Sequence, residues 1–468
     1  MNVTSDSPPP VIVPTRLRLR TAAIMGMILL VVFGTPVGLW HCYDAKWGRE
    51  LEARLAALQA QGIPLSIADA APGPVPDDEN AAVLYQTVFR VSFLGAAQPA
   101  ASPIAELSDV VSGATEEGAL ELAPELRKAL SSPEAAELLD TLRQASERPH
   151  CVFPVRWEDG AGAVFPHMAR FRAATRAVAA RAALSAQDGH VDEALDWTMV
   201  GLRMSEHAAG EPTLIGQLVS YAMQTIVMGR ARDIVSAARV PPAVARRCER
   251  QLRRMDVCPS FRAAVRGETA WGLDTYEMLR RDPWHLYDLL GLMGDASGPN
   301  PVLARLYYTG LASPLHKLDE FVYLHHMEQV RELSKLPYRE SADELAALDK
   351  SLGGLHDYML ARIVCPAWSG PTQKRDRGAA DIALFRTVLA LKSYKHAHGR
   401  YPGTLAQLQE TLDFAMPTDP FSGKNFAYRT KGDGFALYSL GPDPGEDAGV
   451  SDRELQYRAA HAVWECAR

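Results

Sequence analysis

The sequence predicts a mainly α-helical protein with one N-terminal transmembrane helix, an irregular stack of α-helical hairpins and a small α+β module at the C-terminus. Three observations predict this fold: a long uncharged apolar run near the N-terminus, helical spacing of apolar residues through the middle, and two alternating strands joined by a glycine-rich turn near the end. With 468 residues, the chain is long enough for two or three domains.

The composition is that of a globular protein rather than of a nucleic-acid binder. Hydrophobic residues make up 47% of the chain, and the formal net charge is −7. An acidic balance offers no overall basic surface, so we expect no nucleic-acid partner. The six cysteines are scattered and include no Cys-x-x-Cys pair, so we expect buried free thiols. A disulfide between Cys248 and Cys258 is the alternative if this part of the chain is exported.

The N-terminal apolar run has the length of a membrane-spanning helix. Residues 21–43 carry no charge, and roughly 20 residues are enough to cross a bilayer. Arg16, Arg18 and Arg20 precede the run, and an arginine costs about 2.5–3.5 kcal/mol at the bilayer centre. We therefore expect a cytoplasmic tail at residues 1–20, with the bulk of the chain outside the inner membrane. A cleaved signal peptide is the alternative, but no small-x-small cleavage site follows the run.

Residues 44–366 are expected to form an extracytoplasmic α-helical domain. Its most regular part covers residues 165–237, where apolar residues recur at helical spacing on both sides of the turn Asp188-Gly-His190. Small alanines allow two such helices to approach closely. The run from Ala182 to Leu195 looks like a tetratricopeptide-type hairpin, but only one copy is legible, so we expect an irregular stack.

The C-terminal part divides into a linker, a module and a tail. Residues 367–378 are rich in proline, glycine and charge, and are expected to be a linker before the module at residues 379–452. The module begins with an amphipathic helix that Gly399 ends. Alternation predicts two antiparallel strands joined by Lys431-Gly-Asp-Gly434. A helical tail is expected over residues 453–468.

Aromatic, glycine, proline and acidic residues follow one another through this module in a recognisable order: Tyr394, Gly399, Arg400, Tyr401, Pro402, Asp419, Pro420, Tyr428, Gly434, Phe435, Tyr438, Ser439, Leu440, Gly441 and Asp443. In this order they resemble the periplasmic domain of the G-type major pseudopilins of type II secretion. A pseudopilin carries its membrane helix directly before this domain, whereas here the apolar run lies far upstream. The whole chain also resembles large single-pass membrane proteins of planctomycete-like bacteria, a resemblance that implies no activity.

The pseudopilin resemblance implies a calcium site. In that family an acidic loop binds calcium, which implies Asp443, Glu446, Asp447 and Asp452 as candidate metal ligands and calcium as the candidate cofactor. Calcium takes six to eight oxygen ligands at about 2.3–2.6 Å, and converging carboxylates repel one another unless a cation neutralises them. A solvated acidic turn without an ion is the alternative.

Other candidates for chemistry have simpler explanations. Adjacent histidines such as His325 and His326 point about 100° apart on a helix, so they do not chelate one ion unaided. Glu268 is the strongest candidate for a buried carboxylate, and an ion pair with Arg262 or Arg266 would explain it without catalysis. Arginine groups at positions 246–247 and 253–254 are expected to be solvated helix faces.

No serine-nucleophile, phosphate-binding or dinucleotide-binding motif is recognisable, so the sequence leaves enzymatic activity uncertain and favours a protein that is not an enzyme. We therefore expect a membrane-anchored extracytoplasmic scaffold that binds the bilayer through residues 21–43 and an unknown protein partner through its body. Two alternatives remain: an envelope hydrolase whose site lies between helices, and a component associated with a secretion system.

Overall fold

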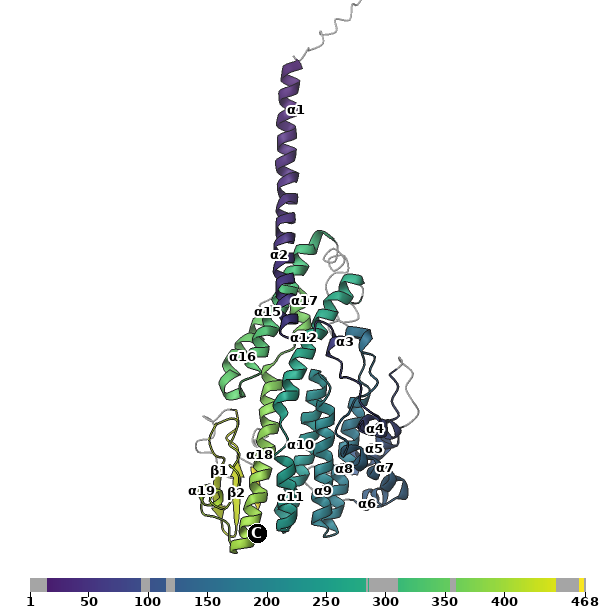
Figure 1. The fold of residues 1–468 in the computed structure, drawn as a ribbon, viewed down its shortest axis with the longest axis vertical. Helices are drawn as coiled ribbons and strands as arrows, with labels where there is room; N and C mark the ends of the chain where they lie inside the picture. The colour runs from purple at the N-terminus through teal and green to yellow at the C-terminus, as the bar shows by residue number, and fades with distance from the viewer. Residues whose placement is uncertain are drawn as a thin grey trace, which may run out of the picture.

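Helices account for most of the computed structural model, which describes residues 15–93, 102–114, 123–282, 285, 310–353, 359–442 and 463–466 (Figure 1). The helical elements are α1 (Thr15–Leu29), the π-helix η1 (Leu30–Gly34), α2 (Thr35–Ala60), α3 (Ile67–Ala70), α4 (Ala81–Phe89), α5 (Pro103–Ala114), α6 (Pro124–Leu130), α7 (Pro133–Ser146), the 3-10 helix η2 (Trp157–Gly162), α8 (His167–Gln187), α9 (Val191–Ala209), α10 (Leu214–Ala237), α11 (Pro242–Leu252), α12 (Val257–Arg281), the 3-10 helix η3 (Gly310–Ala312), α15 (Ser313–Leu333), α16 (Tyr338–Gly353), α17 (Met359–Val364), α18 (Ser369–His398) and α19 (Leu405–Gln409). The strands β1 (Ala427–Lys431), β2 (Gly434–Tyr438) and β3 (Val463–Cys466) form one antiparallel sheet. The predicted mainly α fold with a small antiparallel sheet is confirmed.

The first three elements form one helical rod that projects from the body (Figure 1). Its part from Ala22 to Ala60 is long and apolar enough to cross a membrane, and its most apolar window has a mean hydropathy of 2.2 with no residue buried. Pro36 has no N–H to donate one turn back, which fits the π-helical turn at Leu30–Gly34. The predicted apolar run is therefore an exposed, continuous helix.

From Asp44 onward, α2 packs along α15 of the body. Lys317 Nζ lies 2.7 Å from the Asp44 carboxylate, and the Ser313 hydroxyl donates to the same group over 2.6 Å. These hydrogen bonds hold the pKa of Asp44 below its usual range. Further along, Arg54 pairs with Glu328 at 2.8 Å. The rod is thus joined to the body by packing and ion pairs along its side.

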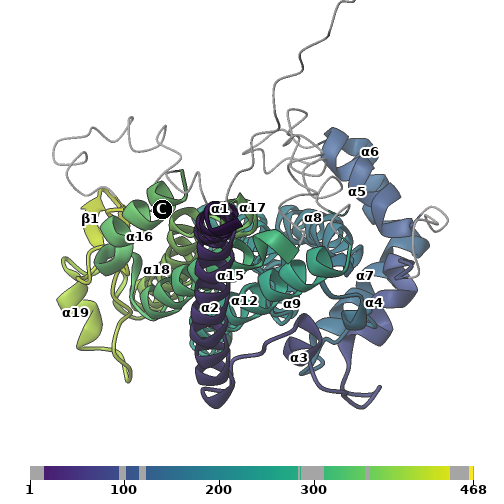
Figure 2. The same cartoon turned by 90° about the horizontal axis from the view of Figure 1, so that it is seen from above.

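The centre of the body is built from α8, α9 and α10, which pack against one another, with α11, α12 and α18 beside them (Figure 1). From above, α4 to α7 lie on one side of these helices and the β-sheet with α19 on the other (Figure 2). The predicted turn between α8 and α9 is present, and Gly189 supplies its left-handed backbone with φ +80°. The two helices contain 21 and 19 residues. Together they are longer than a whole tetratricopeptide repeat, which has about 34 residues.

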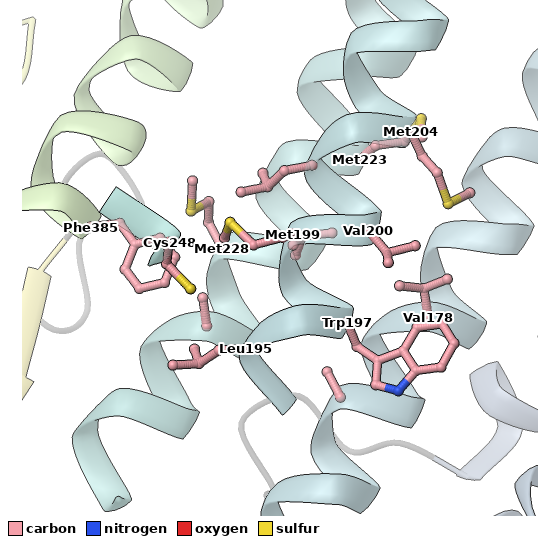
Figure 3. Close-up of a cluster of buried hydrophobic side chains, with 14 of the residues drawn as sticks. Val178, Leu195, Trp197, Met199, Val200, Met204, Met223, Met228, Cys248 and Phe385 are labelled. Atoms are coloured by element: carbon pink, nitrogen blue, oxygen red, sulfur yellow. The ribbon is translucent and has the colours of Figure 1, made fainter. Parts of the chain in front are cut away.

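The main hydrophobic core fills the space between α9, α10, α11 and α18. Met199 and Met228 lie near Cys248 and Phe385, Met223 lies nearer to Met204, and all six side chains are buried (Figure 3). Methionine fills irregular gaps between helices because it is unbranched and flexible. All six cysteines are free, so the Cys248–Cys258 pairing is not formed, and burial raises the pKa of the Cys248 thiol to about 12.

The segment expected as a linker is mostly helix. α18 begins at Ser369, about one-third of its length before the predicted start, and runs for 30 residues. Pro371 is tolerated because it lies in the first helical turn. Arg375 and Asp376 are buried: Arg375 donates to the Ser334 and Leu336 carbonyls, and Asp376 accepts from the Tyr338 N–H. The charged residues that suggested a linker in the sequence are therefore buried residues that bind backbone groups.

The C-terminal tail also differs from the expected helix. Residues Val463–Cys466 form β3, which pairs antiparallel with β2 in the register Phe435↔Cys466 and Leu437↔Trp464. Trp464 is 1% exposed, and its ring stacks on Phe385 with centroids 5.2 Å apart. Burial of Trp464 and Cys466 at alternate positions favours a strand, because a strand places every second side chain on one face. The sheet is thereby fastened to α18.

Candidate functional site

The candidate calcium ligands Asp443, Glu446, Asp447 and Asp452 lie outside the residues that the structure describes. Within the described ranges, no group of three or more His, Cys, Asp or Glu side chains is arranged to hold a metal ion. Calcium binding at the acidic loop therefore stays a prediction.

Asp419, one of the residues that carry the pseudopilin resemblance, is a fully buried structural hub. Its carboxylate accepts hydrogen bonds from the Phe421 N–H at 3.0 Å, the Ser439 hydroxyl at 2.8 Å and the Leu440 N–H at 3.2 Å. The Ser422 hydroxyl donates to it as well, over 3.1 Å. A buried carboxylate is stabilised by several donors, so Asp419 ties its turn to the end of β2 and is fully occupied there.

The aromatic residues of the same resemblance are also structural. The Tyr428 hydroxyl donates to the Pro402 carbonyl over 2.7 Å, and the Tyr401 ring meets Phe435 edge-on at 4.7 Å. Gly399 ends α18 in the left-handed region at φ +76°, as predicted. These motif residues hold the module together and leave its outer surfaces to other side chains.

Glu268 is largely buried, but its partner is not an arginine. Its Oε1 accepts from the Leu214 N–H at 2.7 Å, beside the Thr213 side chain that caps the start of α10. Gly267 makes this possible, because a Cβ there would collide with the Pro212 carbonyl oxygen. Burial raises the pKa of the Glu268 carboxyl to about 7, while the Leu214 N–H opposes that shift.

The histidines have structural surroundings. His326 is buried, and burial lowers its pKa to about 4, whereas His325 lies beside Arg54 on the exposed side. Sequence reasoning missed the buried pair of His167 and Glu211, whose Nε2 and Oε1 atoms lie 2.6 Å apart. Their side chains are 0% and 4% exposed, and the His167 ring stacks on Phe153 at 4.1 Å. A substrate cannot reach this pair without moving the aromatic rings that cover it.

A hollow with convergent charge lies between α11, the last turns of α18 and residues 411–414. We call it the distal groove. It has a volume of about 540 Å³, within the range of ligand pockets. Arg246, Arg250 and Arg253 line one side of it, because positions spaced by four and three residues share one face of a helix and its continuation. Tyr394 and Phe414 also line the groove.

Glu249 fixes two of the neighbouring arginines. Arg253 Nη2 lies 2.6 Å from one carboxylate oxygen, and Arg386 Nη2 lies 3.1 Å from the other. The hydrogen bond to Glu249 raises the pKa of the Arg253 guanidinium. Both guanidinium groups also lie over the Phe414 ring, at 4.2 and 5.7 Å from its centroid. The ring and the carboxylate together hold this side of the groove in one arrangement.

The remaining arginines are not neutralised. Arg246, Arg250 and Arg254 are exposed and have no carboxylate partner within the described part of the chain. Arg250 also lines a second hollow of about 420 Å³, together with Arg203 and Arg254. Glu206 also lines that second hollow. The two hollows form one basic surface that shares Arg250.

The distal groove lies at the end of the body that faces away from α1. Figure 1 shows α11 and the last turns of α18 at the opposite end of the molecule from the apolar rod. Sequence reasoning assigned the arginines of this region to ordinary solvated faces. The spacing of Arg246, Arg250 and Arg253 could have indicated that they share one helix face. The groove itself forms where α11 packs against α18, about 140 residues away in the sequence, and no local sequence pattern predicts that contact.

Comparisons with known proteins add no family to this description. No family model matches the sequence, and neither the curated proteins nor the solved structures include a significant match.

Proposed function

We propose that this protein is a membrane-anchored scaffold that binds a protein partner in the distal groove. In this proposal residues 1–20 stay in the cytoplasm, residues 21–43 cross the inner membrane and the body lies outside. Three arginines before the apolar run support this orientation, because positive residues remain on the cytoplasmic side. The exposed apolar surface of the rod supports insertion into the bilayer.

One observation carries the proposal: the hollow with unneutralised arginines lies at the end of the body remote from the apolar rod (Figure 1). A partner could reach this end without entering the membrane. The helical hairpins of α8 to α10 would act as a rigid support, and their likeness to tetratricopeptide units belongs to this proposal.

A secretion-system role is a second candidate, because Phe414 and the last turns of α18 belong to the pseudopilin-like module. That module would then present a binding wall rather than polymerise. Calcium at the acidic loop would stabilise the same module.

Two measurements test the main proposal. Alkaline phosphatase fused after Arg468 should be active in intact bacterial cells, whereas a fluorescent protein that folds only in the cytoplasm should be dark at the same position. A photo-crosslinking amino acid at Ala397, an exposed residue of the groove, should give a discrete adduct in cells. The same probe at Arg176, exposed on α8, is the control. An inactive phosphatase would refute the orientation, and equal adducts at both positions would refute the groove.

A further inference from the structure

We propose that the occupant of the distal groove is an acidic peptide segment that also carries apolar side chains. This inference rests on the proposed function only in taking the groove as the place where a partner binds. It adds the chemical class of that partner. The charge of the groove, its apolar surface and its position each give a separate argument.

Charge gives the first argument. Glu249 already engages Arg253 and Arg386, so these two guanidinium groups have a carboxylate. Arg246 and Arg250 are exposed at the same groove and have none among the described residues. A guanidinium binds a carboxylate through two parallel N–H donors, which is why arginine suits acidic partners. The groove therefore has two vacant positions for carboxylates on one rim.

The floor gives the second argument. Ala397 and Leu412 line the groove with apolar surface, together with the partly exposed rings of Tyr394 and Phe414. A polyanion that is charged along its whole length would leave this surface uncovered. A peptide that alternates acidic and apolar side chains would bury it, and removing apolar area from water stabilises binding.

The aromatic rings argue against a nucleic acid. Single-stranded nucleic acids bind by stacking bases on open aromatic faces. Here Arg253 lies over the Phe414 ring at 4.2 Å from its centroid, and Tyr394 stacks with His398 at 4.0 Å, so each ring already has a stacking partner. The Asp413 carboxylate also lies in the groove, where it would repel a continuous phosphate backbone.

The shape and position argue against a lipid surface. A flat membrane does not enter a concave hollow of about 540 Å³. The groove also faces away from the apolar rod, so the membrane that would hold the rod cannot reach it (Figure 1). A protein segment can bind the arginines, cover the apolar lining and reach the groove at this end of the body.

The experiment selects peptides without assuming their sequence. Full-length protein in phosphatidylcholine nanodiscs is used to select from a library of displayed random 16-residue peptides, with Ala397→Trp protein in the same nanodiscs for counter-selection. Ala397 is exposed and its side chain is a methyl group, so tryptophan adds bulk to the groove without removing a side-chain hydrogen bond. Enrichment of peptides that combine Asp or Glu with Leu, Ile or Phe is expected. Absence of enrichment, or enrichment of neutral or basic peptides, would overturn the proposal.

Direct binding of the best peptide then tests the arginines. Arg246→Gln and Arg250→Gln should each weaken binding about two- to fivefold, and their combination more, with a smaller effect at high salt. Arg176→Gln is the matched control, since Arg176 is an exposed arginine on α8 outside the groove. Unchanged affinity in both groove variants would overturn the acidic class. Displacement of the peptide by phosphatidylglycerol vesicles, with the same arginine dependence, would overturn it in favour of a lipid.

The outcomes separate this inference from the proposed function. If Ala397→Trp blocks selected peptides that carry no acidic preference, the groove remains a binding site and only the chemical class fails. If the crosslinking probe at Ala397 also gives no adduct in cells, the proposed function fails with it.

Discussion

Glu268 offers a quantitative test of how burial acts on a carboxyl group in this fold. Its Oε1 accepts from the Leu214 N–H, and burial raises its pKa to about 7 from an ordinary value of 4.5. The substitution Glu268→Gln keeps an acceptor at the same place and removes the charge. The variant should therefore lose the part of the pH dependence of stability that Glu268 causes.

The sign and size follow from the two pKa values. The folded state holds the proton more tightly than the unfolded state, so the free energy of unfolding is highest below pH 4.5 and falls as the pH rises to about 7. A shift of about 2.5 pH units corresponds to about 3.4 kcal/mol, and about 2.5 kcal/mol of this falls between pH 5 and pH 8. The difference between variant and wild type should grow by that amount, in favour of the variant, across this range.

The assay is urea unfolding of full-length protein in a nonionic detergent, followed by tryptophan fluorescence at each pH. Taking the difference between the two proteins cancels other groups in the same range, such as Asp381, whose pKa burial raises to about 6. Glu277→Gln is the control, because Glu277 is half-buried on the same helix and pairs with Arg280 and Arg281. A difference between Glu268→Gln and wild type that stays constant from pH 5 to pH 8 would refute the reasoning.

Three further predictions concern backbone contact, the Asp419 hub and calcium. Gly267→Ala should lower the free energy of unfolding by about 3 kcal/mol or more because its Cβ would meet the Pro212 backbone, whereas Gly229→Ala, in an open helical position, should raise it by about 0.5–1 kcal/mol; equal effects in urea unfolding would contradict the close approach. Asp419→Ala should destabilise the protein by about 3–5 kcal/mol, since it leaves buried donors without an acceptor, and Asp419→Asn should cost less. A loss below about 1 kcal/mol for Asp419→Ala would mean that the hub is not needed. The pseudopilin resemblance predicts that millimolar calcium raises the melting temperature of the wild type and not of Asp447→Asn. A melting temperature unchanged by calcium or chelator would remove the ion.

Local signals predicted much of the fold. Ser132 before Pro133 and Asn80 before Ala81 begin helices, because each side chain accepts a backbone N–H of the first turn. The hairpin at residues 431–434 is also as predicted, with Gly432 at φ +57° supplying the turn. These features depend on residues within one turn of each other, so the sequence alone specifies them.

The failures were non-local. Arg375 in the expected linker is buried because carbonyl groups at the end of α15 surround it, about 40 residues away. Trp464 is a strand residue because β2 and Phe385 lie next to it in space. The distal groove was missed for the same reason, since its two walls meet only after α18 has packed on α11. At these positions tertiary contacts, rather than local composition, determine the secondary structure and the burial of the side chains.

The contacts between α2 and α15 would limit the movement of the body in the proposed membrane-anchored state. A flexible linker would let the body take many orientations relative to the membrane. Here α2 is held by Lys317 and Glu328 of α15, so the rod and the body move together. Membrane helices lean by about 20° on average from the bilayer normal. The distance of the distal groove from the bilayer would then depend only on the tilt of the rod. A partner would bind it within a narrow range of distances from the membrane.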